Sequence, residues 1–197
     1  MSSINLELKR QGIHLLVGLI LIAFILFSSV LVSAITFSFL LVCGIILSGF
    51  LSNKKQRKTI KLFDSILNSV ERKNELEIPG CGVIIFFIGA LIALFLFQEK
   101  LLVISALTVL VFGDSASTLI GTQFGKTKIK TKMGWRSLEG SIAFFVVSSI
   151  ALSFLINPLI ALPVCFIGML CEYLPINDNL LIPFVSGIAL KLLLILL

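Results

Sequence analysis

Seven apolar stretches separated by short polar turns occupy most of the 197-residue chain. A membrane-spanning helix needs about 20 apolar residues, with a range of about 17–25. The pattern therefore predicts seven transmembrane helices in one membrane-embedded domain over residues 1–197, an all-α fold. The expected helices cover residues 13–27, 31–51, 81–97, 101–121, 138–156, 159–171 and 180–197.

Two polar segments are longer than turns, about 52–80 and 122–137. In the first, Ile60, Phe63, Leu67 and Val70 recur at helical spacing among Lys and Arg. This spacing is typical of an amphipathic helix on the inner membrane surface. A connector that covers its own apolar face is the favoured alternative.

The composition supports a membrane protein. Hydrophobic residues make up 58% of the chain and charged residues 13%, whereas soluble domains average about 45–50% and about 25%. An ordinary soluble enzyme, a disordered protein and a nucleic-acid-binding domain are therefore excluded. The four cysteines show no ligand spacing, so we expect free thiols rather than disulfides or a metal site.

The basic residues predict the orientation. The net charge is +6, and a cytoplasmic N-terminus would put fourteen of the sixteen Lys and Arg residues on the cytoplasmic side. The C-terminus would then lie outside. The outer turns are too short to hold a site, so any active site should face the cytoplasm. We expect the cell membrane or the endoplasmic reticulum as the location.

Asp114 is the residue that the apolar pattern explains least. It lies fourteen residues into the predicted helix 101–121, where a carboxylate costs about 2.5–3.5 kcal/mol on insertion scales. Helical spacing places Asp114, Ser117, Thr118 and Gly121 on one face. A helix–helix seam accounts for Ser117 and Gly121, but Asp114 favours a functional role.

A basic, glycine-rich segment follows this helix. It combines backbone freedom with cations, as phosphate binding requires. Its candidate phosphate ligands are Gly121, Gly125, Lys126, Lys128, Lys132, Arg136, Ser137 and Gly140. The glycine spacing and the preceding apolar helix exclude a P-loop. Ser137 is expected to cap the next helix, whose start is itself an anion site.

Three further carboxylates lie on the same predicted membrane side: Glu139, Glu172 and Asp178. Glu139 suits either a first helical turn or a functional role. Asn177 fits a turn or cap, and His14 fits the membrane interface. Carboxylates together with phosphate oxygens are the usual ligands of Mg²⁺. With lysines, arginines and glycines, they make the residue set of phosphoryl transfer.

Four stretches resemble the CTP-dependent lipid-alcohol kinases, a family that includes dolichol kinase, phytol kinase and the CTP-dependent diacylglycerol kinase. They are residues 9–14 (KRQGIH), 113–121 with 124–126, 136–141 (RSLEGS), and Glu172 with 178–180 and Pro183. The resemblance implies transfer of the CTP γ-phosphate to a lipid hydroxyl at the cytoplasmic face. The partners would be CTP, a lipid alcohol and membrane lipids, with Mg²⁺ as cofactor and without nucleic acid. The sequence does not decide the oligomeric state, and a homodimer is one of the alternatives.

The resemblance also implies roles for residues. Asp114 would lie near the lipid hydroxyl, as metal ligand or proton acceptor, and Glu139 would be a second catalytic group. Lys126, Lys128, Lys132 and Arg136 would hold the triphosphate. Glu139, Glu172 and Asp178 would join Asp114 as Mg²⁺ ligands. Asn177 and Asn179 would read the cytosine edge or cap the last helix.

Several alternatives stay open at this stage. Dolichol or another polyprenol is the favoured substrate, and phytol, geranylgeraniol and diacylglycerol are the others. A cytidylyltransferase that makes a CDP-lipid would use the same nucleotide, metal and membrane. A small transporter would use Asp114 as its coupling site. A purely structural membrane subunit would tolerate alanine at Asp114, Arg136 and Glu139.

Overall fold

A computed structural model describes residues 3–52, 78–132 and 134–196 of the chain. Seven helices lie within these ranges, and each matches one of the predicted apolar stretches. The helices are α1 (Ser3–Phe27), α2 (Val30–Ser52), α5 (Cys81–Phe97), α6 (Lys100–Phe124), α7 (Leu138–Ser153), α8 (Pro158–Cys171) and α9 (Asp178–Leu196). The seven predicted helices are thus confirmed as helices.

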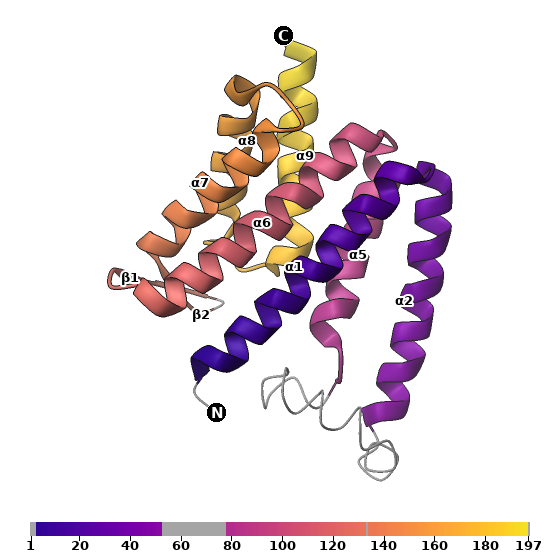
Figure 1. Cartoon of the computed structure of the whole chain (residues 1–197), viewed down its shortest axis with the longest axis horizontal. Helices are drawn as coiled ribbons and strands as arrows, with labels where there is room; N and C mark the ends of the chain where they lie inside the picture. The colour runs from indigo at the N-terminus through magenta and orange to yellow at the C-terminus, as the bar shows by residue number, and fades with distance from the viewer. Residues whose placement is uncertain (1–2, 53–77, 133, 197) are drawn as a thin grey trace.

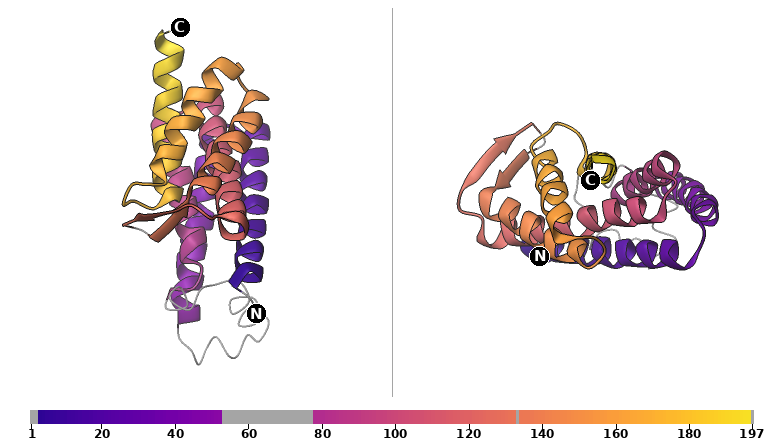
Figure 2. Two further views of the ribbon diagram at one scale, coloured as in Figure 1. Left: turned by 90° about the vertical axis from the view of Figure 1, so that its left-hand side faces the viewer. Right: turned by 90° about the horizontal axis from the view of Figure 1, so that it is seen from above.

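The helices run alternately up and down in one bundle. Helix α1 begins at one end of this bundle, and α9 ends at the other (Figure 1). The start of α1 and the segment between α6 and α7 share one end, and the C-terminus lies at the other (Figures 1 and 2). The polar residues of the site described below come from the end at which α1 begins.

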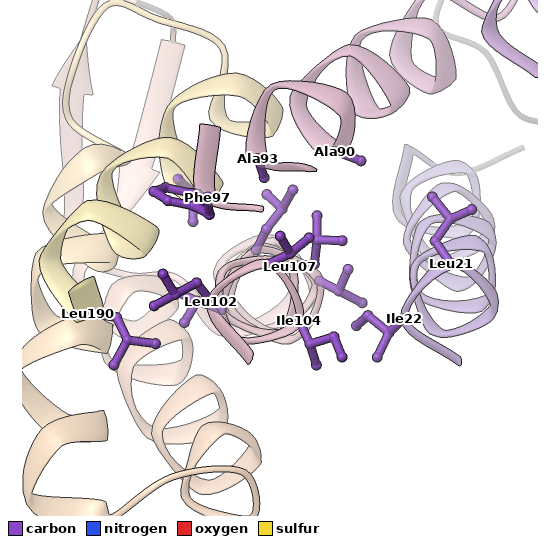
Figure 3. Close-up of a cluster of buried hydrophobic side chains, with 14 of the residues drawn as sticks. Leu21, Ile22, Ala90, Ala93, Phe97, Leu102, Ile104, Leu107 and Leu190 are labelled. Atoms are coloured by element: carbon purple, nitrogen blue, oxygen red, sulfur yellow. The ribbon is translucent and has the colours of Figure 1, made fainter. Parts of the chain in front are cut away.

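Helix α6 is the centre of the bundle. Of its most apolar 18-residue stretch, 72% is buried, against 17–33% for the other long apolar helices. Figure 3 shows α6 end-on, with Leu21 and Ile22 of α1 on one side and Phe97 of α5 and Leu190 of α9 on the other. Because α6 packs against so many neighbours, its polar residues have fixed surroundings.

Four helices are long and apolar enough to cross a membrane, among the residues that the structure describes: Asn5–Phe27, Val30–Ser52, Lys100–Phe124 and Asp178–Leu196. These helices indicate a membrane protein. Helices α5, α7 and α8 are apolar but shorter. The predicted amphipathic helix falls within residues 53–77, outside the described residues.

The fold differs from the all-α prediction in one place. The segment 122–137, expected to be a loop, begins with the last turn of α6 and continues as an antiparallel hairpin of β1 (Lys128–Thr131) and β2 (Gly134–Ser137). Arg136 pairs with Ile129 in the hairpin register. Two strands of only four residues each, Lys-Ile-Lys-Thr and Gly-Trp-Arg-Ser, carry little apolar signal, so periodicity could not separate them from a loop.

The first helix also differs from the prediction. It begins at Ser3, ten residues before the apolar stretch that predicted it. The extra turns carry Glu7, Arg10 and Gln11, and Glu7 and Gln11 are buried. Apolar periodicity could not extend the helix into these turns, because their buried face is polar.

Helices α5 and α9 approach so closely that only glycine fits at position 89. A Cβ atom at Gly89 would clash with the backbone oxygen of Asn179 at the start of α9, and a backbone atom cannot swing away. Overpacking of this kind costs about 1–3 kcal/mol. We expect Gly89→Ala to lower the unfolding temperature measured in detergent.

The matched control for this prediction is Gly44→Ala in α2. A Cβ atom at Gly44 meets nothing within 4 Å, and alanine favours a helix over glycine by about 1 kcal/mol. We expect Gly44→Ala to leave the unfolding temperature unchanged or to raise it. Equal unfolding temperatures for the two variants would contradict the close approach of α5 and α9.

Candidate functional site

A cavity of about 420 Å³ lies where α1, α6, the hairpin and the start of α9 meet. Its walls are mainly polar, and three acidic and three basic side chains line it: Glu7, Asp114, Asp178, Arg10, Lys128 and Arg136. The predicted stripe of Asp114, Ser117, Thr118 and Gly121 forms the α6 wall, so the shared face is confirmed. Ser137, Asn177 and Asn179 also line the cavity.

Arg136 connects the hairpin to the start of α9. Its Nη2 donates a hydrogen bond to Oδ2 of Asp178, and its Nη1 lies 3.9 Å from Oε1 of Glu172. Burial lowers the pKa of Arg136, but Asp178, Glu172 and Asp114 outweigh burial, so the pKa is raised. Arg136 therefore stays charged, with 22% of its side chain exposed at the cavity.

Glu172 lies fully buried behind this arginine, just beyond the end of α8. It accepts hydrogen bonds from Ser117 of α6 at 2.5 Å and from Ser141 of α7 at 3.2 Å. Burial raises the pKa of Glu172 to about 7, although Ser117 and Arg136 act in the opposite direction. Glu172 joins three helices and the hairpin, so the geometry gives it a role in positioning Ser117 and Arg136.

The three glycines that the sequence suggested as phosphate ligands, Gly121, Gly125 and Gly140, pack α6 against α7. A Cβ atom at Gly140 would lie 2.8 Å from the backbone oxygen of Ser117, and one at Gly121 would lie 2.8 Å from Oγ of Ser137. Gly125 also packs against Ser137. Of the three glycines, Gly121 lines the cavity. These close approaches explain the glycines without a bound phosphate.

Ser137 is the N-cap of α7, as predicted. Its Oγ accepts a hydrogen bond from the backbone N–H of Gly140 at 3.1 Å. Asn177 caps α9 in the same way, because its Oδ1 accepts from the backbone N–H of Asn179 at 3.0 Å. Asn179 donates through Nδ2 to the oxygen of Gly82 at 3.5 Å. Of the two roles predicted for Asn177, the geometry shows the cap.

Several predicted site residues do not line this cavity: Glu139, Lys126, Lys132, Gly125, Gly140, Glu172 and His14. Glu139 accepts hydrogen bonds from the backbone N–H of Thr127 at 3.0 and 3.2 Å, so it anchors the segment before the hairpin. Lys126 and Lys132 are exposed and do not line the cavity. Their number and charge suggested phosphate ligands, but Lys128 and Arg136 are the predicted basic ligands that line the cavity.

The four predicted metal ligands do not gather in one place. Within the described parts of the chain, no three His, Cys, Asp or Glu residues are grouped to hold a metal. Asp114 and Asp178 line the cavity. Glu172 instead accepts hydrogen bonds from two serines, and Glu139 accepts hydrogen bonds from a backbone N–H. This donor set fits Mg²⁺ in the mode that uses one or two carboxylates together with substrate phosphates. All four cysteines are free, as expected.

Sequence reasoning gave no site role to Glu7, Arg10, Gln11 or Trp135, although Arg10 and Gln11 lie in the stretch 9–14 that carries part of the resemblance. Helical spacing could have found Glu7, Arg10 and Gln11, because these residues share one face of a helix with His14. His14 of this face lies next to Asp114, with Nε2 3.9 Å from Oδ2. Trp135 is 66% exposed and lines the cavity rim from the hairpin.

Comparison with known proteins gives one informative relative. The uncharacterized protein MJ1137 of Methanocaldococcus jannaschii is 34% identical over 182 residues, which cover 91% of this chain and 90% of the relative. The chain belongs to the same family as MJ1137. No family model and no solved structure matches it. The likeness to MJ1137 extends over almost the whole of both chains, so it takes in most of the helices that build the cavity.

Proposed function

We propose that this protein is a CTP-dependent kinase that transfers the γ-phosphate of CTP to the hydroxyl of a membrane lipid alcohol. One observation carries the proposal. A single cavity joins Asp114, from an apolar helix of membrane-spanning length, to Arg10, Lys128 and Arg136. Phosphoryl transfer depends on positioning and charge neutralisation, and this set of side chains supplies both. The four-part sequence resemblance adds the nucleotide and the lipid acceptor.

The reaction assigns a separate task to each side of the cavity. Asp114 accepts the proton of the acceptor hydroxyl while the hydroxyl oxygen bonds to the γ-phosphorus. The bond from that phosphorus to the β–γ bridging oxygen breaks, and CDP leaves. A positioned carboxylate base contributes about 10²–10⁴ in rate. Arg136, Lys128 and Arg10 neutralise the charge on the phosphate oxygens.

The cavity volume suits a nucleotide. Ligand pockets are usually about 300–1,000 Å³, and this one is about 420 Å³. The triphosphate would lie along Lys128 and Arg136, with Trp135 and Asn179 at the rim for the base. Mg²⁺ would be held by Asp178 with phosphate oxygens, and it would supply further neutralisation of the transferred group.

The cavity is lined by the start of α1, the hairpin and the start of α9, and these segments lie toward the end of the bundle where α1 begins (Figure 1). We propose that all seven helices cross the membrane, with the N-terminus and the cavity on the cytoplasmic side. The excess of Lys and Arg on that side supports this orientation. The opposite placement of the two chain ends fits an odd number of crossings.

The acceptor we favour is dolichol or another polyprenol, with phytol, geranylgeraniol and diacylglycerol as the alternatives. A transporter is disfavoured because the start of α1, the hairpin and the start of α9, which line the cavity, lie toward one end of the bundle (Figure 1). A cytidylyltransferase is the closest rival, because it would use the same cavity to make a CDP-lipid.

Position-specific labels separate the two reactions. The purified protein is given α-labelled or γ-labelled CTP with Mg²⁺ and a panel of lipid alcohols and phosphorylated lipids, and label is followed into the organic phase. We expect lipid label from γ-labelled CTP and none from α-labelled CTP. Lipid label from α-labelled CTP, with release of pyrophosphate, would instead establish the cytidylyltransferase.

A further inference from the structure

A second, smaller cavity of about 150 Å³ adjoins the first. The two share Arg10, Gln11, Asp114 and Asn179, so Asp114 faces both. The remaining walls of the second cavity come from α1 and from the start of α5. The second cavity therefore reaches Asp114 from a different side than the proposed nucleotide site.

Two buried polar atoms of this cavity have no partner among the described residues: Oε1 of Gln11 and Nε2 of His14. Gln11 is 8% exposed, and 15% of the His14 side chain is exposed. Buried polar atoms are nearly always hydrogen-bonded. Two such atoms on adjacent turns of α1, both lining a cavity, point to a polar group that binds between them and Asp114.

The spacing suits one hydroxyl oxygen. Nε2 of His14 lies 3.9 Å from Oδ2 of Asp114, which is too far for a direct hydrogen bond. An oxygen between them can lie about 2.8 Å from both, the usual hydrogen-bond distance. The His14 ring is held in place by Phe86 of α5, edge-on with 4.8 Å between the ring centroids.

Apolar side chains make up the rest of this cavity: Ile13, Val17, Val83 and Phe86. They suit the hydrocarbon next to a hydroxyl. The cavity thus has a polar end at Asp114 and an apolar body. A primary alcohol on a hydrocarbon chain matches both.

We propose that the second cavity binds the hydroxyl-bearing end of the acceptor alcohol, with His14 and Gln11 orienting the hydroxyl toward Asp114. This inference rests on the proposed kinase function. Nε2–H of His14 donates to the hydroxyl oxygen, and the hydroxyl proton is directed to Asp114. Oε1 of Gln11 offers a second acceptor on the same wall. When the oxygen bonds to the γ-phosphorus, its proton passes to Asp114 and CDP leaves.

Two variants test the assignment against the wild-type protein. His14→Ala removes the donor, and Val83→Trp fills the apolar body without changing a polar group. We expect each to raise the KM for the alcohol or to lower kcat by about tenfold or more. The KM for CTP should stay within about twofold of the wild-type value. Stabilisation of the wild-type protein by the alcohol alone, measured as a rise in unfolding temperature, should be lost in both.

The matched control is Ala151→Trp. Ala151 lines a separate apolar groove formed by α1, α6 and α7, which also contains Ile22 and Phe112. We expect this variant to keep wild-type alcohol kinetics. Loss of alcohol turnover in Ala151→Trp, with normal turnover in Val83→Trp, would overturn the inference and place the acceptor in that groove.

The outcomes separate this inference from the function on which it rests. A folded wild-type protein without phosphate transfer would overturn the kinase, and the inference with it. An active wild-type protein with unchanged alcohol kinetics in Val83→Trp would overturn the inference alone. If His14→Ala does not fold, His14→Gln keeps a donor at similar reach, and Val83→Trp still decides the location.

Discussion

Replacing Asp114 by Asn is expected to abolish phosphate transfer while the protein stays folded. The substitution keeps the size of the side chain and removes its charge and its ability to take a proton. We expect kcat to fall by at least about 10³-fold, within the range for loss of a general base. The unfolding temperature should stay the same or rise, because a carboxylate within a membrane helix is costly. Label transfer and thermal unfolding in detergent measure the two effects.

Ser115→Ala is the matched control for Asp114→Asn. Ser115 is the next residue of α6, it is buried, and its hydroxyl has no hydrogen-bond partner among the described residues. It does not line the cavity around Asp114. We expect the kcat of the Ser115→Ala protein to stay near the wild-type value. A folded and fully active Asp114→Asn protein would remove Asp114 from the reaction.

Arg136→Ala is expected to produce the second large effect, on nucleotide use. The guanidinium lines the cavity and is held there by Asp178 and Glu172. A hydrogen bond to a charged group contributes about 1.5–3 kcal/mol, so kcat/KM for CTP should fall by about 10- to 150-fold, since each tenfold is about 1.36 kcal/mol. Arg136→Lys should recover part of this loss, because Lys keeps the charge but not the planar fork.

Lys132→Ala separates this prediction from a general effect of positive charge. Lys132 is exposed in the same basic segment and does not line the cavity. Its loss should change kcat/KM for CTP by less than about twofold. Equal effects of Lys132→Ala and Arg136→Ala would show that the charge of the segment matters and that the cavity geometry does not.

The sequence alone was sufficient for the features that depend on local pattern. Apolar stretches located the seven helices, because a helix that is buried or spans a membrane needs a long apolar run. The cost of a carboxylate in such a run singled out Asp114, and helical spacing supplied its face. Ser137 was recognised as a cap from its residue type and its position before an apolar run.

The sequence was not sufficient where residues distant in the chain meet. The cavity needs the first turns of α1 beside the last turns of α6, and no local pattern reports that pairing. Glu139 carries the same charge as Asp178, yet it binds the backbone of Thr127 while Asp178 lines the cavity. The glycines of the basic segment suggested phosphate contacts, but their surroundings show close packing of α6 on α7.

The basic residues of this segment are not equivalent in the structure. Lys128 and Arg136 line the cavity, and Lys132 lies at the far end of the hairpin. A charge count predicted four equivalent phosphate ligands, and the fold places two of them at the cavity.

The proposed kinase is tested most directly by transfer of γ-label from CTP to a lipid alcohol, measured with the purified protein in detergent with Mg²⁺ beside Asp114→Asn. We expect labelled lipid in the organic phase for the wild-type protein and none for the variant, with both proteins folded. Absence of lipid label from CTP and from ATP in the folded wild-type protein would contradict this proposal.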